Sequence, residues 1–282
     1  MMRGMFAAIS GLKTHQVMLD VTANDIANVN TIGYKSARAT FKDSLSQLQR
    51  GASGQIGSNA GTNSAQVGLG VQLGSIDNLM STGATQSTGN PYDVAIQGSG
   101  FFRVGLVASP TAVPVNPQNL QYTRAGNFTC NQEGFLVTQD GYYVLGQDDG
   151  GNPIALKIPP DASGLAIAQD GEVSYIDPAP VDPAKPRKVV GFISLAMFPN
   201  AAGLERSSNN RWQESANSGK GVPVKPGEDG SGFTTPGAIE MSNVDLASAF
   251  TSMFTAQRGF QANSRVISTS DEMLQDLVNL KR

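Results

Sequence analysis

Each end of the chain carries a long stretch in which apolar residues recur in alternating steps of three and four. At the N-terminus this heptad spacing predicts an amphipathic helix over about residues 3–28. The Asn- and Gly-containing run of residues 28–33 predicts its end, because both residue types favour turns and left-handed backbone. The positions of this first stripe are Met2, Met5, Ile9, Leu12, Gln16, Leu19, Ala23 and Ile26.

A second stretch, near the C-terminus, follows the same rule. It predicts a helix over about residues 243–279, which would be about 55 Å long. Ser242 with Asp245 three residues later predicts a capping box at its start. Gly259 weakens the helix by about 1 kcal/mol relative to alanine. The positions of this second stripe are Leu246, Ala249, Met253, Ala256, Phe260, Asn263, Ile267, Ser270, Leu274 and Leu277.

Neither helix can bury its apolar stripe alone, so the helices must pair with each other or with other copies of the chain. A helical hairpin that closes a globular domain is one interpretation. Oligomerisation is favoured, because Gln16, Ala23, Asn263 and Ser270 interrupt the stripes, which weakens a two-helix core and suits crowded packing among many helices. The expected assembly interface therefore contains Met5, Ile9, Leu12, Leu19, Ile26, Leu246, Met253, Phe260, Ile267, Leu274 and Leu277.

The chain between the two helices is of a different kind. Residues 51–66 contain Ile56 as their single bulky apolar side chain, which predicts a flexible linker or a segment that only its neighbours order. Residues 67–232 hold short runs rich in β-branched and aromatic residues between turn signals, which predict strands. The predicted strands include residues 93–96, 100–104, 134–137, 142–145 and 188–198, and the Pro-rich runs 110–117 and 178–186 are predicted surface loops.

The predicted fold class is therefore α+β, with discontinuous terminal helices, a central all-β domain and an extended linker between them. The helical domain is expected to comprise residues 1–33 and 243–282. The linker region is expected to comprise residues 34–66 and 233–242, and the β domain residues 67–232.

The composition excludes several classes of function. A net charge of −3 offers no concentration of positive charge for nucleic acid or an anionic membrane surface. One histidine and one cysteine put the usual zinc sites out of reach. The sequence contains no run approaching 18 consecutive apolar residues, so no membrane-spanning helix is predicted. We therefore predict no enzyme activity, no catalytic residue, no cofactor and no metal.

Five isolated features have an ordinary structural interpretation. The glycines of residues 68–74 lack the spacing and the following helix of a dinucleotide loop, and residues 148–152 lack the alternating ligands of a calcium loop. His15 has no nucleophile near it in the sequence. Cys130 lies beside a predicted turn, and Trp212 is expected to pack in the interior.

Several motifs resemble those of the bacterial flagellar rod and hook axial proteins. Residues 19–35 are similar to the N-terminal signature of that family, with Asp25 in place of the usual Asn. Residues 93–102 and 122–128 are similar to strands of its shared β domain, and residues 240–246, 257–265, 269–274 and 280–282 to its C-terminal motifs. The motif residues carried over are Asn24, Asn28, Gly33, Gln257, Arg258, Asn263 and Ser264.

This resemblance implies a structural subunit whose copies stack helically into a tube. The terminal helices would line an inner, coiled-coil-like tube around the export channel, and the β domain would form the outer layer. The implied partners are other copies of the chain, the distal rod protein, the hook cap and hook–filament junction proteins and the flagellar export apparatus. The implied location is the extracellular part of the flagellum, reached through the flagellar channel without a cleaved signal peptide, and no nucleic acid or membrane insertion is implied.

Within this family, the hook subunit and the distal rod subunit are close relatives. Gly259–Phe260 and the final Leu280-Lys281-Arg282 favour the hook subunit, whose flexible curved tube would act as a universal joint and transmit torque from rod to filament. The polar residues 51–66 have a counterpart in the distal rod subunit, which is the alternative. A secreted β-rich enzyme or glycan-binding module with helical ends is the interpretation from a different functional class.

Overall fold

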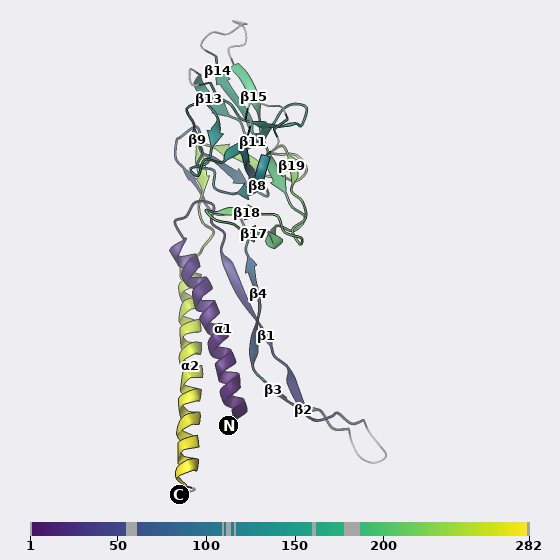
Figure 1. The fold of residues 1–282 in the computed structure, drawn as a ribbon, viewed down its shortest axis with the longest axis vertical. Helices are drawn as coiled ribbons and strands as arrows, with labels where there is room; N and C mark the ends of the chain where they lie inside the picture. The colour runs from purple at the N-terminus through teal and green to yellow at the C-terminus, as the bar shows by residue number, and fades with distance from the viewer. Residues whose placement is uncertain are drawn as a thin grey trace. The chain divides into compact units, whose positions relative to one another are not determined.

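The computed structural model describes residues 2–54, 61–108, 110, 114–115, 117–159, 162–177 and 187–280. The chain divides into two compact units. The helical unit comprises Met1–Ala27, Ala37–Leu79 and Asp245–Arg282, and the β unit comprises Asn28–Ser36 and Met80–Val244. The predicted combination of two terminal helices with a central β domain is confirmed (Figure 1).

The helical unit contains both predicted helices, α1 (Met2–Ala27) and α2 (Leu246–Asn279). The prediction of a capping box formed by Ser242 and Asp245 at the start of α2 is wrong. The N-cap is Asp245 itself, whose carboxylate accepts a hydrogen bond from the amide of Ala247 at 3.0 Å. A short carboxylate at the N-cap reaches the second amide of the helix directly, so no partner three residues away is needed. Within the described residues, neither helix is long and apolar enough to cross a membrane.

A long β-hairpin accompanies the two helices within the helical unit (Figure 1). Strand β1 (Ala37–Asp43) pairs with β4 (Val71–Asn78), and β2 (Ser46–Arg50) pairs with β3 (Ala65–Gly68), all antiparallel. Ser53 and Thr62 form a further bridge toward the tip. The segment expected to be a linker, residues 51–66, is therefore held by the strands that flank it, and its residues 55–60 lie outside the described residues.

The β unit is built around a sheet of 13 strands. Its hydrogen-bonded path runs β13 (Ser163–Ile167), β14 (Glu172–Ile176), β15 (Arg187–Ile193), β11 (Tyr143–Gln147), β7 (Phe101–Val107), β8 (Pro117–Thr123), β18 (Arg211–Gln213) and β17 (Glu205–Arg206). Attached to this path are β9 (Thr129–Cys130), β10 (Leu136–Val137), β12 (Pro153–Ala155), β16 (Leu195–Met197) and β19 (Val222–Val224). A short 3-10 helix spans Ala201–Gly203.

Two small strand pairs complete the β unit. Strand β6 (Val94–Gln97) pairs with β20 (Phe233–Pro236), and β5 (Thr85–Ser87) pairs with β21 (Ala238–Glu240). The chain that leads into α2 therefore crosses the β unit as paired strands. It is not the extended linker that the sequence predicted for residues 233–242.

Most of the predicted strands are confirmed, with one correction. The runs 93–96, 100–104, 134–137 and 142–145 correspond to β6, β7, β10 and β11. The run 188–198, predicted as one strand, forms β15 and β16, which separate at the buried Ser194. Of the Pro-rich runs, the first ends where Pro117 begins β8, and residues 178–186 lie outside the described residues.

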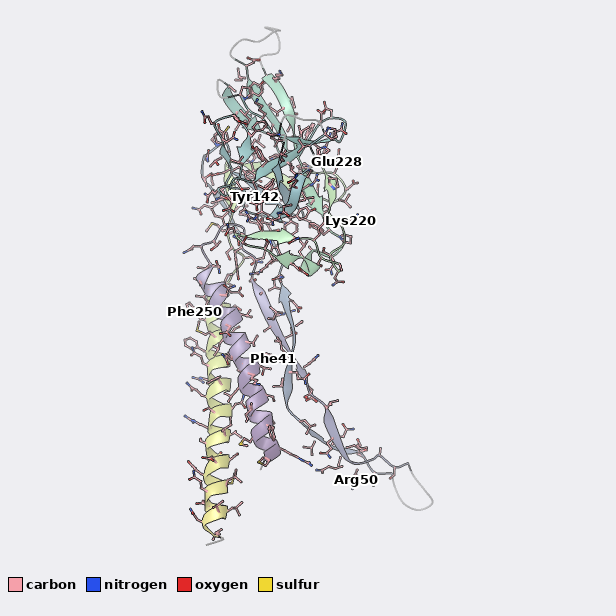
Figure 2. The ribbon with its side chains drawn as sticks, viewed as in Figure 1. Phe41, Arg50, Tyr142, Lys220, Glu228 and Phe250 are labelled. Carbon is pink, nitrogen blue, oxygen red and sulfur yellow. The ribbon has the colours of Figure 1, made fainter. Side chains whose placement is uncertain are left out.

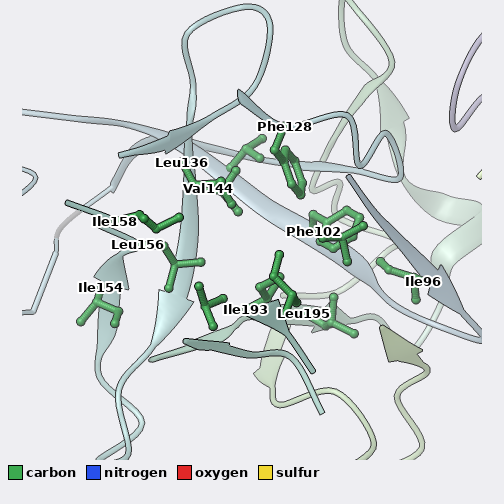
Figure 3. Close-up of a cluster of buried hydrophobic side chains, with 14 of the residues drawn as sticks. Ile96, Phe102, Phe128, Leu136, Val144, Ile154, Leu156, Ile158, Ile193 and Leu195 are labelled. Carbon is green, nitrogen blue, oxygen red and sulfur yellow. The ribbon is translucent and has the colours of Figure 1, made fainter. Parts of the chain in front are cut away.

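The main core of the β unit is apolar and draws on β6 and on many strands of the large sheet (Figure 3). Phe102 and Phe128 meet edge to face with ring centroids 5.0 Å apart. The other labelled members of this cluster are Ile96, Leu136, Val144, Ile154, Leu156, Ile158, Ile193 and Leu195. Among the described residues, all three clusters of buried apolar side chains lie in the β unit.

The boundaries of the two units differ from the expected domain boundaries at two places. Residues 67–79, expected in the β domain, pair with β1 and β2 in the helical unit. Residues 28–36 and 233–244, expected in the helical domain or the linker, belong to the β unit. Strand pairing explains the first difference. The second rests on the pairing of β20 and β21 with β6 and β5 and on a buried ionic cluster described below.

Candidate functional site: an assembly surface

The contact between α1 and α2 is made by small residues. A Cβ atom added to Gly11 would lie 2.6 Å from Nδ2 of Asn263, and one added to Gly259 would lie 2.6 Å from the ring of His15. A step of four residues forward in α1 corresponds to four backward in α2, so the helices run antiparallel. The residues buried in the two helices are Ala8, Gly11, Thr14, Asp25, Ala249, Ala256 and Ser270.

The α1 side chains expected in the interface are less buried than the small residues next to them in the sequence. Met5, Ile9, Leu12, Leu19 and Ile26 are all half-buried, whereas Ala8, Gly11 and Thr14 are buried. The packed face of α1 is therefore rotated from the predicted stripe, because small side chains allow a closer approach to α2 than large ones.

On α2 the contact follows the predicted stripe for most of its length. Met253, Ile267 and Leu274 are half-buried, as is the motif residue Asn263, while Leu246, Phe260 and Leu277 are exposed. Gly259 takes the contact position next to Phe260. The remaining motif residues of the helices, Asn24, Gln257, Arg258 and Ser264, are exposed.

Helix α2 leaves a row of aromatic side chains uncovered. Phe250 and Phe254 are four residues apart, on one face, and 43% and 60% exposed. Figure 2 shows Phe250 on this helix. No charged residue occurs from Leu246 to Gln257. An uncharged, aromatic helix face in water is typical of a surface that another protein covers.

The last turns of α2 are also uncovered. The antiparallel pairing places Met2, the first residue of α1, opposite about Glu272, so the end of α2 extends past α1. The exposed apolar residues there are Met273, Leu277, Val278 and Leu280. On α1, Met2 and Phe6 are exposed as well.

The hairpin adds a third uncovered apolar surface. Leu45 is 79% exposed and Leu48 is 56% exposed. Leu69, between β3 and β4, is exposed as well. All five side chains of β2 are exposed. A two-stranded ribbon without a packed face is marginally stable alone, so contacts with other surfaces must stabilise it.

Three contacts hold the root of this hairpin on α1. The amide of Ala37 lies 3.2 Å from both carboxylate oxygens of the buried Asp25. The ring of His15 meets the ring of Phe41 edge to face, with centroids 5.7 Å apart. Further along, Ser10 Oγ accepts a hydrogen bond from the amide of Val71 at 3.2 Å. His15 thus serves packing between α2, α1 and β1.

A buried ionic cluster lies inside the β unit, and the sequence analysis did not find it. One carboxylate oxygen of Glu240 accepts hydrogen bonds from Lys35 Nζ at 2.6 Å and from the amide of Gly83 at 2.9 Å. The other accepts from Arg124 Nη1 at 3.0 Å. The side chains of Lys35 and Glu240 are fully buried. Burial lowers the pKa of Lys35, and the Glu240 carboxylate acts in the opposite direction.

This cluster explains part of the N-terminal signature. Gly33 has a φ of +68°, and a Cβ there would lie 2.6 Å from the amide nitrogen of Ala125. Its own amide donates to the backbone oxygen of Glu240 at 2.8 Å. Only glycine fits this backbone and this approach, so Gly33 and Lys35 serve the β unit rather than the helices. Asn28 accepts a hydrogen bond from the hydroxyl of Thr31 in the turn before them.

The other isolated features have structural surroundings. Trp212 is buried, and the guanidinium of Arg206 lies 5.2 Å from its ring centroid. Cys130 is half-buried at the end of β9, and burial raises the pKa of its thiol. Among the described residues, no three His, Cys, Asp or Glu side chains are placed to hold a metal ion.

Comparison with known proteins places this arrangement in a family. Three family models match: "Flagella basal body rod protein" over residues 5–35, "Flagellar hook protein FlgE/F/G D1 domain" over residues 95–175, and "Flagellar basal body rod FlgEFG protein C-terminal" over residues 235–280. The flagellar basal-body rod protein FlgG of Bacillus subtilis is 47% identical, and the alignment covers 100% of both chains.

The chain belongs to the flagellar rod and hook protein family. FlgG of Caulobacter vibrioides is 38% identical over 99% of this chain and 100% of its own. The flagellar hook protein FlgE of Borreliella burgdorferi is 28% identical, in an alignment of 442 residues that covers both chains completely. Members of this family are structural components of the flagellum, as the resemblance implied.

Proposed function

We propose that the chain is a subunit of the flagellar rod, and specifically of its distal part, that polymerises with copies of itself. The observation that carries this proposal is full-length similarity to FlgG rod proteins at up to 47% identity in the relatives compared. The hook protein of Borreliella burgdorferi is 28% identical in sequence, and its alignment is 160 positions longer than this chain. The expectation of a hook subunit is therefore not confirmed, and the alternative fits better.

The uncovered apolar surfaces of the helical unit support self-assembly. Phe250 and Phe254 on α2, the last turns of α2 and the hairpin residues Leu45 and Leu48 would each lose water-exposed apolar area against a neighbouring copy. These surfaces differ from one another, so one copy would present one of them to a different one on the next copy. Such heterologous contacts give an open helical polymer whenever the rotation between copies does not close a ring.

The hairpin also supports a rod rather than a hook subunit. Strands β2 and β3 extend the hairpin beyond the strands held on α1 and expose Leu48 and Val67, and the resemblance gives residues 51–66 a counterpart in the distal rod subunit. A ribbon that contacts further copies would cross-link neighbours and stiffen the polymer. A straight, stiff tube suits a rod, whereas a hook must bend on each revolution.

Assembly of the purified chain tests the role of α2. Phe250→Ser and Phe254→Ser should leave the monomer's unfolding midpoint unchanged, because both side chains are exposed, and should raise the critical concentration for polymerisation at least about tenfold. Thr255→Ala is the matched control, since its hydroxyl bonds only within α2, to Ser252 O. Wild-type assembly of both Phe variants would contradict this role.

Deletion of the gene separates rod from hook. If the chain is a distal rod subunit, cells without it should lack the distal rod and every structure beyond it, and electron microscopy of basal bodies reads this directly. Basal bodies that keep a complete rod and lack only the curved hook would instead identify a hook subunit.

A further inference from the structure

The segment Asn28–Ser36, which follows α1 in the chain, makes several polar contacts with the rest of the β unit. Lys35 Nζ donates to Glu240 Oε1 and to the backbone oxygen of Ser81, both within 2.8 Å. The amide of Ser36 donates to Asn243 Oδ1 at 2.8 Å. The backbone oxygen of Ile32 accepts from Asn210 Nδ2 at 2.6 Å.

A second group of contacts on this segment comes from Arg206. Its guanidinium lies 4.8 Å from the ring centroid of Tyr34 and donates to the Tyr34 hydroxyl and to the backbone oxygen of Lys35. In the described part of the chain, no side chain of residues 28–36 belongs to the three apolar clusters of the β unit. The buried aromatic side chain of the segment, Tyr34, stacks on Arg206 and lies outside those clusters, so release of the segment would expose Tyr34 and leave the clusters closed.

We propose that residues 28–36 form a strap that opens and closes on the β unit independently of its core. The ion pair between Lys35 and the Glu240 carboxylate holds the strap closed. Glu240 neutralises two buried cations that come from distant parts of the chain, Lys35 in the strap and Arg124 after β8. Only Lys35 can leave for water when the strap opens. Arg124 keeps its hydrogen bonds to Glu240 and to the backbone oxygen of Gly98, so the open β unit retains a paired charge.

The strap joins the end of α1 to the start of β1, and both of these elements belong to the helical unit. When the strap is closed, contacts with the rest of the β unit fix its residues from Ile32 to Ser36. Any use of the open strap during assembly rests on the proposed function, whereas the strap itself is a property of the monomer.

Hydrogen exchange measured by mass spectrometry on the full-length monomer tests the strap. In Glu240→Gln, exchange of peptides that cover residues 28–36 should rise about 100-fold, because a buried cation then lacks its counter-charge. Peptides that cover β7 and β11 in the core should exchange as in the wild type. Asn210→Gly, which removes one strap contact and keeps the positive φ of that position, should raise exchange of the same strap peptide about tenfold.

The control is Arg38→Ala. Arg38 forms an ion pair with Asp77 at 3.8 Å, and both side chains are largely exposed, so its loss should leave every peptide unchanged. Equal acceleration in strap and core peptides, or collapse of the β unit in Glu240→Gln, would show that the cluster belongs to the global fold and overturn the strap. Unchanged strap exchange in Glu240→Gln and Asn210→Gly would overturn it as well. Sedimentation at polymerising concentrations measures assembly separately, so failure of the proposed function would not alter these readings.

Discussion

His15 of α1 lies directly over Gly259 of α2, and its ring occupies the space that a side chain at position 259 would need. A Cβ at Gly259 would lie 2.6 Å from the imidazole carbon Cε1. The ring cannot simply move away, because Phe41 of β1 packs against it edge to face. The glycine thus fixes the spacing of three elements of the helical unit.

Gly259→Ala should therefore destabilise the helical unit despite its better helix propensity. The gain of about 1 kcal/mol from replacing glycine in a helix is smaller than the 1–3 kcal/mol typical of overpacking. Urea unfolding followed by the helical circular dichroism signal measures the difference. Gly4→Ala is the control, because a Cβ there has no neighbour within 4 Å and should not destabilise α1. A Gly259→Ala variant more stable than the wild type would refute the packing argument.

Asp25 should tolerate asparagine better than alanine. The amide of Ala37 donates to its carboxylate, and an asparagine oxygen can still accept that bond. Asp25→Ala leaves the partly buried amide of Ala37 without this acceptor, which should cost about 1–3 kcal/mol, whereas Asp25→Asn should cost less than about 1 kcal/mol. Chemical unfolding of both variants measures this order. Equal losses would mean that the charge, rather than the acceptor, holds β1 on α1.

The exposed leucines of the hairpin should matter for the polymer and not for the monomer. Leu45→Ser and Leu48→Ser should change monomer stability by less than about 0.5 kcal/mol, because both side chains already face water. Burial of one leucine against a neighbour stabilises by about 1.5–3 kcal/mol, so each variant should raise the critical concentration roughly 10- to 100-fold. Gln47→Ser is the control, because Gln47 is exposed and lies on the opposite face of β2 from Leu48. Normal assembly of both leucine variants would remove the hairpin from the interface.

Tyr122 should make the protein less stable in alkali. Burial raises the pKa of its hydroxyl well above the usual value of 10.0, and its 2.5 Å hydrogen bond to Glu214 acts in the same direction. Above pH 10 the unfolded chain releases this proton and the folded chain keeps it, so unfolding becomes more favourable by up to about 1.4 kcal/mol per pH unit. In Tyr122→Phe the urea midpoint should fall less between pH 10 and 11 than in the wild type. Parallel pH profiles would show that Tyr122 does not cause the slope.

The helices could be predicted because their periodicity extends over 26 and 34 residues. The most buried face of α1 could not be predicted. It contains the small residues Gly11 and Thr14 rather than the largest apolar side chains. The hairpin was missed for a related reason. Residues 44–70 show little alternation of apolar and polar residues, in keeping with strands β2 and β3, neither of which has a buried residue in the monomer.

The ionic cluster was beyond sequence reasoning for a different reason. Lys35, Arg124 and Glu240 are about 90 to 200 residues apart, and no spacing rule connects charges at such distances. A cue did exist, since all three lie in motifs that resemble the family. A charged residue in such a motif, next to apolar or glycine neighbours, deserves consideration as a buried pair.

The antiparallel course of α1 and α2 has a practical consequence for labelling. The first residue of α1 and the last turns of α2 lie at the same end of the helix pair (Figure 1). A fluorescent protein or affinity tag fused to either terminus would therefore crowd the uncovered apolar turns there. The exposed turn at Asp148–Gly151, within the β unit, offers a position for an inserted epitope far from those turns in the sequence.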